Sequence, residues 1–200
     1  LFLSPTAIKR REWELAERFR PGAAPPRPEA DALLLGTLAH GFLQAIDFGA
    51  PEPLEPALAD YLERQEFAPG TDRGALFAEL YEIFRAFFAS PVFAELRSSA
   101  ILGREVPLLI DWDGQIMEGV IDLLYERNGS LYIADYKTDR IARENLAPAS
   151  GAYRRQAEVY RRAVSLGLGR EVAAFKLIFL RLGAAVEIEP PRDRRDEEQR

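Results

Sequence analysis

The hydrophobic pattern of this 200-residue chain changes near residue 100. Over residues 31–48 the apolar side chains Leu35, Leu38 and Phe42 recur at helical spacing. Beyond residue 100 the apolar segments are short and rich in β-branched and aliphatic residues, as in ILGREVPLLI over 101–110. A segment with one of these periods does not fit the backbone conformation of the other. The pattern therefore predicts a helical first part followed by a sheet.

The first part contains four segments that we expect to be helices. Each carries an apolar stripe, and proline-rich breaks separate several of them. Pro91 is expected to end the last helix, because proline breaks the helical hydrogen-bond ladder. The four segments span residues 4–19, 31–48, 56–66 and 72–89.

The second part predicts a mixed sheet. We expect strands at 101–110, 115–126, 130–138 and 172–182, a helix at 151–166, and a short edge strand at 185–189. A three-strand meander, a helix and a returning strand indicate an α/β fold, with a mixed central β-sheet flanked by helices. We expect one domain over 1–190, mainly helical over 1–98 and α/β over 99–190, followed by a charged tail over 191–200.

The chain has no cysteine, which excludes disulfide scaffolds, zinc–thiolate sites, iron–sulfur clusters and cysteine nucleophiles. No segment resembles a signal peptide or a membrane span, so we expect a cytoplasmic protein that does not enter a membrane. The chain begins at Leu1 rather than methionine, and we expect that it was cut from a longer protein. The net charge of −6 argues against a protein that coats nucleic acid, but not against one that grips a few phosphates locally.

Asn128-Gly129 lies between two of the predicted strands and is typical of a tight hairpin turn. With these residues at the turn, residue 127 pairs with 130, 125 with 132, and by the same count 122 with 135. Asp122 and Asp135 would then be direct cross-strand neighbours, with Cβ atoms about 5 Å apart. Facing carboxylates destabilise a sheet unless a cation lies between them. A divalent ion such as Mg²⁺ or Mn²⁺ prefers such oxygen ligands.

Lys137 shares a strand face with Asp135, because side chains alternate along a strand. The chain has only two other lysines, Lys9 and Lys176. A lysine beside a metal-binding aspartate can orient an attacking water or stabilise charge that develops on a phosphate. The alternative interpretation is a polar strand end that simply meets solvent.

The two halves of this hairpin resemble the PD-(D/E)XK nuclease superfamily. Its motifs are matched by Gly119-Val120-Ile121-Asp122 and by Asp135-Tyr136-Lys137-Thr138. Within the superfamily the chain resembles the RecB-type nuclease domains of AddA and RecB helicase–nucleases, since three further segments match in family order. They are Gly36–His40, Arg104–Pro107 and Gln156–Tyr160. Ile121 stands where the superfamily's name expects proline.

The resemblance implies a restriction-endonuclease-like core and a set of site residues. His40, Asp122, Asp135 and the backbone carbonyl of Tyr136 would bind Mg²⁺ or Mn²⁺. The catalytic residues would be Asp122, Asp135, Lys137, Gln156 and Tyr160, the last two on a helix face that looks onto the site and the DNA backbone.

Each of the remaining candidates has a plainer alternative. His40 could be an ordinary core or surface histidine. Glu105 could bind a second metal or merely solvate the start of a strand. Gln156 and Tyr160 lie four residues apart and could belong to a partly buried polar helix face.

Several basic side chains are candidates for contacts to DNA phosphates, because arginine donates to phosphate in bidentate fashion. They could equally be ordinary surface residues. They are Arg154, Arg155, Arg161 and Arg162, and more weakly Lys9, Arg10 and Arg11.

Taken together, these features predict metal-dependent hydrolysis of DNA phosphodiester bonds. The family implies cleavage of single strands or of duplex ends, coupled to a helicase motor. No GxxxxGK[ST] sequence occurs, so we expect the motor in another domain or chain. The alternatives are a catalytically silent module that binds DNA or a partner, and a phosphohydrolase that is not a nuclease.

Overall fold

Five strands form one mixed sheet in which the spatial order follows the sequence order. β1, β2 and β3 form an antiparallel meander, β4 runs parallel to β3, and β5 returns antiparallel to β4. The computed structural model describes residues 29–112 and 115–188. The expected helix at 4–19, the tail at 191–200, and Lys9, Arg10 and Arg11 lie outside the described residues. The strands are β1 (Ala100–Trp112), β2 (Gln115–Arg127), β3 (Ser130–Lys137), β4 (Val172–Phe179) and β5 (Ala184–Ile188).

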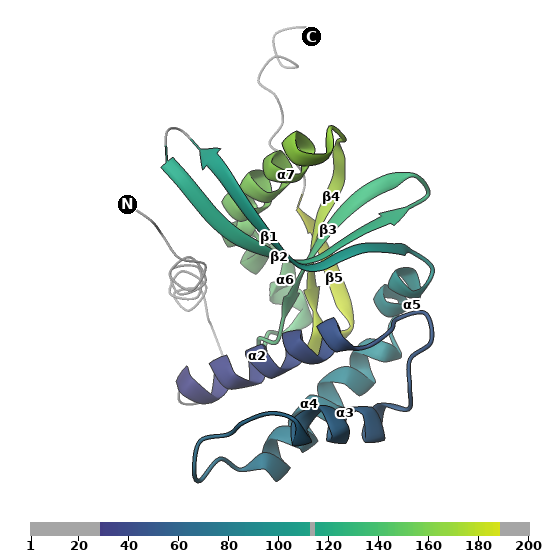
Figure 1. The fold of residues 1–200 in the computed structure, drawn as a ribbon, viewed down its shortest axis with the longest axis vertical. Coiled ribbons are helices and arrows are strands. Elements are labelled where there is room, and N and C mark those ends of the chain that lie inside the picture. The colour runs from purple at the N-terminus through teal and green to yellow at the C-terminus, as the bar shows by residue number, and fades with distance from the viewer. Residues whose placement is uncertain (1–28, 113–114, 189–200) are drawn as a thin grey trace, which may run out of the picture.

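Helices cover both faces of the sheet (Figure 1). One face carries α2 (Glu29–Ala45), α3 (Leu54–Glu63), α4 (Arg73–Phe88) and α5 (Pro91–Arg97); the other carries α6 (Leu146–Ser150) and α7 (Arg154–Leu168). Single 3-10 turns span Arg143–Asn145, Gly151–Tyr153 and Leu180–Leu182. In the described part of the chain, no helix combines the length and the apolar character needed to cross a membrane. The expected α/β fold with a mixed, helix-flanked sheet is confirmed.

Two hydrophobic clusters hold the three layers together. The first packs α2–α5 against one sheet face and includes Phe42, Phe84 and Tyr125. The second packs α6 and α7 against the opposite face and includes Ile133 and Phe175. Burial of this apolar surface supplies the main driving force for the fold.

Pro91 does not simply end a helix, as expected, but begins α5. Ser90 caps α5, because its hydroxyl accepts a hydrogen bond from the Phe93 amide at 3.2 Å. Proline suits the first turn of a helix, where its missing N–H is not needed. This short helix was not predicted from the sequence.

The side chains of the β1–β2 hairpin change from one face of the sheet to the other in the middle of the hairpin. On β2, Ile121 packs in the α7 cluster, whereas Leu123 packs in the cluster of α2–α5. Strict alternation would place residues two apart on the same face. The change lies between the pairs Arg104–Leu123 and Val106–Ile121, and the residues between them are Glu105 and Asp122. The hairpin is therefore irregular at the point where its two acids face each other.

Candidate metal centre

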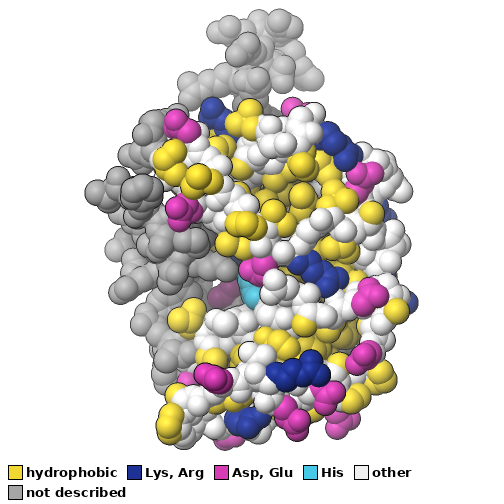
Figure 2. Space-filling model, in the orientation of Figure 1, with side chains coloured by type: hydrophobic (Ala, Val, Ile, Leu, Met, Phe, Trp, Pro, Cys, Tyr) yellow, Lys and Arg dark blue, Asp and Glu magenta, His cyan; other side chains and the backbone are white. Residues whose placement is uncertain are grey.

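Three side chains from three elements converge at this irregularity. Nδ1 of His40 on α2 lies 3.3 Å from Oδ1 of Asp122 on β2 and 3.6 Å from Oε1 of Glu105 on β1. One ligand atom of each residue lies within 4.8 Å of the others. In Figure 2 the histidine, in cyan, lies beside acidic side chains, in magenta, in a hollow near the middle of one face. An imidazole and two carboxylates at this spacing can hold a divalent cation.

The backbone of Glu105 helps to explain this convergence. Its φ is +49°, in the left-handed region that residues other than glycine rarely adopt. Such a residue breaks the alternation of a strand, and strained backbone of this kind clusters at functional sites. From the sequence, Glu105 was expected at a second metal or at a solvated strand start; the structure places it in the same cluster as His40 and Asp122.

His40 is oriented through its second ring nitrogen. Nε2 lies 3.1 Å from the carbonyl oxygen of Tyr136, which leaves Nδ1 facing the two carboxylates. Histidines that bind metals commonly donate their other N–H to a backbone carbonyl in this way. Gly36 lies one turn earlier on α2, where a Cβ would be 3.6 Å from Oγ1 of Thr138, so the helix passes close to the end of β3.

The predicted hairpin register is confirmed for the pairs Arg127–Ser130 and Tyr125–Tyr132. The last paired residues are Leu123 and Ala134. One step further, Oδ2 of Asp122 accepts a hydrogen bond from the Tyr136 amide at 2.7 Å. Asp122 is therefore tied to the backbone of β3 beside Asp135.

Asp135 is held by two other candidate residues. Its Oδ2 lies 2.7 Å from Nζ of Lys137, and its Oδ1 accepts a hydrogen bond from Nε2 of Gln156 at 3.2 Å. Nζ of Lys137 also lies 4.2 Å from the ring centre of Tyr153. Asp135 and Lys137 thus share a face, as expected, and both lie next to α7. The sequence places Tyr153 three residues before Gln156 on the same face but assigns it no role at the site. In the structure Tyr153 lies in the 3-10 turn that leads into α7.

Three buried oxygens at the site accept no hydrogen bond from the described residues: Oδ1 of Asp122, Oδ2 of Asp135 and Oε1 of Gln156. The first lies 3.3 Å from Nδ1 of His40, and the second forms the 2.7 Å ion pair with Lys137. Buried polar atoms without a hydrogen-bond partner are rare, and each calls for an explanation. All three are acceptors, which a bound cation with its water ligands would satisfy. The donor set therefore fits Mg²⁺ or Mn²⁺.

Comparison with known proteins agrees with this chemistry. The sequence profile of the PD-(D/E)XK nuclease superfamily matches residues 10–200. The chain belongs to this superfamily.

Relatives of the chain are named as the A-type subunits of ATP-dependent helicase/nucleases. The protein from Desulforudis audaxviator is 27% identical over 92% of this chain and 17% of its own length. Those from Heliobacterium modesticaldum and Staphylococcus saprophyticus are 32% and 28% identical, each over 74% of this chain and over 12% and 14% of their own lengths. The chain thus spans less than a fifth of each of these relatives.

One solved structure, from Eubacterium rectale and named provisionally as an exonuclease, has a similar fold. The match has a TM-score of 0.51 at 16% identity and covers 88% of this chain and 63% of that protein. At this identity the likeness supports the fold alone. It agrees with the restriction-endonuclease-like core expected from the sequence.

The helix α7 carries the remaining superfamily motif, Gln156 to Tyr160. Tyr160 packs over the β2 backbone, because a Cβ at Gly119 would lie only 2.8 Å from its hydroxyl oxygen. Both Gln156 and Tyr160 are buried. Glycine at position 119 therefore makes room for the tyrosine, and Tyr160 lies beside the distal part of the β1–β2 hairpin.

The four arginines of α7 do not share one environment. Arg154, Arg155 and Arg162 are exposed, and the guanidinium of Arg162 lies 5.1 Å from the ring centre of Trp112. Arg161 is buried, and its guanidinium donates to the carbonyl of Ile188. Arg161 is thus engaged in joining α7 to β5, so only the other three remain candidates for contacts to phosphate.

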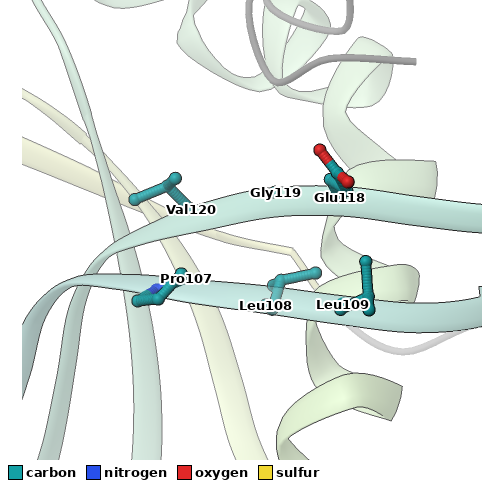
Figure 3. A pocket seen from close by; sticks show the side chains of 6 residues that line it. All are labelled: Pro107, Leu108, Leu109, Glu118, Gly119 and Val120. Carbon is teal, nitrogen blue, oxygen red and sulfur yellow. The ribbon is translucent and has the colours of Figure 1, made fainter. Parts of the chain in front are cut away.

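A shallow pocket lies on the hairpin next to the metal centre (Figure 3). It begins at Pro107 and Val120, two residues from Glu105 and Asp122 along the two strands. Glu118 is the single charged side chain of its lining. The lining of this pocket therefore offers no positive charge to a phosphate. The lining residues are Pro107, Leu108, Leu109, Glu118, Gly119 and Val120.

Tyr136 and Tyr125 form a matched pair for a stability measurement. Burial above all, and next the Asp122 carboxylate, raise the pKa of Tyr136 well above its usual value, and its hydroxyl has no hydrogen-bond partner among the described residues. The hydroxyl of Tyr125 instead donates to Glu95 at 2.9 Å. We expect Tyr136→Phe to keep or raise stability, by up to about 1 kcal/mol, and Tyr125→Phe to lose about 1–2 kcal/mol.

Urea unfolding of both variants in EDTA would measure this difference. A Tyr136→Phe variant that loses as much stability as Tyr125→Phe would show that the Tyr136 hydroxyl is hydrogen-bonded.

Proposed function

We propose that this chain is a nuclease domain that hydrolyses DNA phosphodiester bonds with Mg²⁺ or Mn²⁺. The observation that carries the proposal is the group of buried oxygens without hydrogen bonds beside His40 and Lys137 in a member of the PD-(D/E)XK superfamily. His40 and Asp122 would hold the ion together with Glu105. Asp135 lies on β3 and is a further proposed ligand. The Tyr136 carbonyl, which the resemblance implies as a ligand, lies 3.1 Å from Nε2 of His40 instead.

The bound ion would supply Lewis acidity to a phosphate oxygen and lower the pKa of a water molecule. Lys137 provides a positive charge beside that position, and Asp135 and the Tyr153 ring hold its ammonium in place. Gln156 fixes the Asp135 carboxylate by donating a hydrogen bond. Tyr160 supports the strand that carries Asp122 by packing over Gly119.

The proposed substrate is single-stranded DNA or a duplex end. Arg154, Arg155 and Arg162 would contact the DNA backbone as exposed donors on α7. The relatives named as helicase/nucleases support a helicase motor as partner, in the same chain or in another, and a role in DNA end processing and recombinational repair. A motor that tethers the nuclease would raise the effective DNA concentration, which suits a chain of net charge −6.

Incubating the purified chain with labelled linear and circular DNA, single-stranded and duplex, tests the function. We expect cleavage with Mg²⁺ or Mn²⁺ and none in EDTA, and a steep fall in rate as salt rises. Cleavage of circular single strands would assign an endonuclease, and cleavage of linear DNA alone an exonuclease. DNA binding without cleavage in either metal would instead identify a catalytically silent module.

A further inference from the structure

Arg104 on β1 lies against the C-terminal end of helix α2. Its Nη1 donates to the carbonyl of Gln44 at 3.1 Å and to the carbonyl of Ile46. The guanidinium also lies 4.3 Å from the ring centre of Phe48. The last carbonyls of a helix lack partners within the helix, and α2 has no basic residue in its own last turn. Arg104 therefore caps α2 from the sheet.

This cap joins two of the three residues of the metal centre. Gln44 lies one helical turn after His40, so fixing its carbonyl fixes the end of the helix that carries the imidazole. Glu105 directly follows Arg104 and has the left-handed φ of +49°. The distance of 3.6 Å between His40 Nδ1 and Glu105 Oε1 therefore depends on how α2 is seated on β1.

We propose that Arg104 is a positioning residue of the metal centre, which sets the placement of His40 relative to Glu105 by capping α2. The inference rests on the proposed metal-dependent function. Arg104 touches neither the metal position nor the reacting atoms. It acts through the backbone of Glu105 and through the helix that holds His40.

The geometry requires arginine rather than a positive charge alone. A planar guanidinium can donate to two carbonyls while its face stacks on Phe48. A lysine at this position would keep the charge and its ammonium donors but would lose the planar stacking on Phe48. Arg104→Lys should therefore retain part of the effect, and Arg104→Ala should retain none.

Arg73 offers a matched control away from the site. It donates to the carbonyl of Leu62, near the end of α3, at 3.3 Å, and its guanidinium lies 5.0 Å from the ring centre of Phe67. Its contacts are of the same kind as those of Arg104. They join α3 to the start of α4 and involve no residue of the metal centre.

Calorimetric titration with Mn²⁺, together with thermal unfolding in EDTA, tests the proposal. We expect Arg104→Ala to weaken Mn²⁺ binding about tenfold or more, Arg104→Lys to weaken it less, and Arg73→Ala to leave it unchanged. The positioning role predicts coupling: in a His40→Ala background, Arg104→Ala should weaken Mn²⁺ binding little further. If Arg104→Ala fails to fold, the comparison uses Arg104→Lys in both backgrounds.

Wild-type Mn²⁺ affinity in the Arg104 variants would overturn the proposal, and so would an equal loss with and without His40. Asp122→Asn separates this failure from failure of the metal centre itself. If Asp122→Asn binds Mn²⁺ as the wild type does, or if the wild type binds none, the proposed centre is wrong. If Asp122→Asn loses Mn²⁺ binding while the Arg104 variants keep the wild-type affinity, the metal centre is supported and only the role of Arg104 is wrong.

Discussion

Replacing Asp122 by asparagine is expected to lower DNA cleavage about a thousandfold or more. Asp122 is buried, its Oδ1 faces His40, and its Oδ2 accepts the Tyr136 amide. Asparagine keeps the size of the side chain but removes the charge that a divalent cation needs. Single-turnover cleavage of labelled single-stranded DNA in Mg²⁺ and in Mn²⁺ measures the loss.

Thermal unfolding distinguishes loss of chemistry from loss of fold. Without metal, Asp122→Asn should unfold at the wild-type temperature or above it, because the substitution removes a charge facing the Glu105 carboxylate. Glu126→Gln is a matched control, since Glu126 lies on the same strand and pairs with Arg170 at the surface. Cleavage at the wild-type rate by Asp122→Asn would remove this residue from the catalytic site.

Replacing Glu95 by alanine is expected to destabilise the fold by about 2–4 kcal/mol, because it breaks a partly buried polar network and leaves the buried Lys176 with a weaker partner. Oε1 of Glu95 accepts from Nζ of Lys176 at 2.8 Å and from the Tyr125 hydroxyl at 2.9 Å. Its Oε2 lies 2.8 Å from Nη1 of Arg127. Lys176 is buried, and without Glu95 it keeps an ion pair only with the exposed Glu187, at 3.2 Å, among the described residues.

Chemical denaturation at neutral pH measures this loss, with Glu82→Ala as control. Glu82 pairs with Arg85 three residues later on exposed α4 surface, so its removal should change stability by less than about 0.5 kcal/mol. The double variant Glu95→Leu with Lys176→Met should recover much of the stability, because both charges leave together. Equal effects of Glu95→Ala and Glu82→Ala would show that the Glu95 network contributes little.

The same network predicts an acid limit. Burial acts to raise the pKa of Glu95, but the hydrogen bonds from Lys176 and Tyr125 and the nearby positive charges outweigh it and lower the pKa. A carboxyl group with a lowered pKa in the folded state stabilises the fold above its unfolded pKa, and that contribution is lost as pH falls through the folded value. The stability difference between wild type and Glu95→Ala should therefore shrink below about pH 4.

The features that could be predicted from the sequence are those set by local pattern. Asn128-Gly129 fixes the turn, and the turn fixes the paired register up to Leu123 and Ala134. Strand alternation then places Asp135 and Lys137 on one face, and the distance of 2.7 Å between their charged groups agrees with that placement.

The features that could not be predicted depend on distant contacts. The irregularity at Glu105 and Asp122 depends on the positive φ of Glu105, a conformation that the sequence would normally indicate by a glycine. Strand alternation alone therefore could not predict that Glu105 lies beside His40. Arg161 is buried because it donates to the carbonyl of Ile188 in β5, far along the chain. The sequence alone therefore suggests that all four arginines of α7 are exposed.

The three residues of the metal centre are far apart in the chain, at positions 40, 105 and 122. Glu105 and Asp122 come together when one hairpin closes, a local event that takes microseconds in small systems. His40 joins them only after α2 docks on the sheet, across a much longer loop. A partly folded chain therefore brings Glu105 and Asp122 together without His40. The proposed nuclease activity would arise only once the helical layer has packed on the sheet.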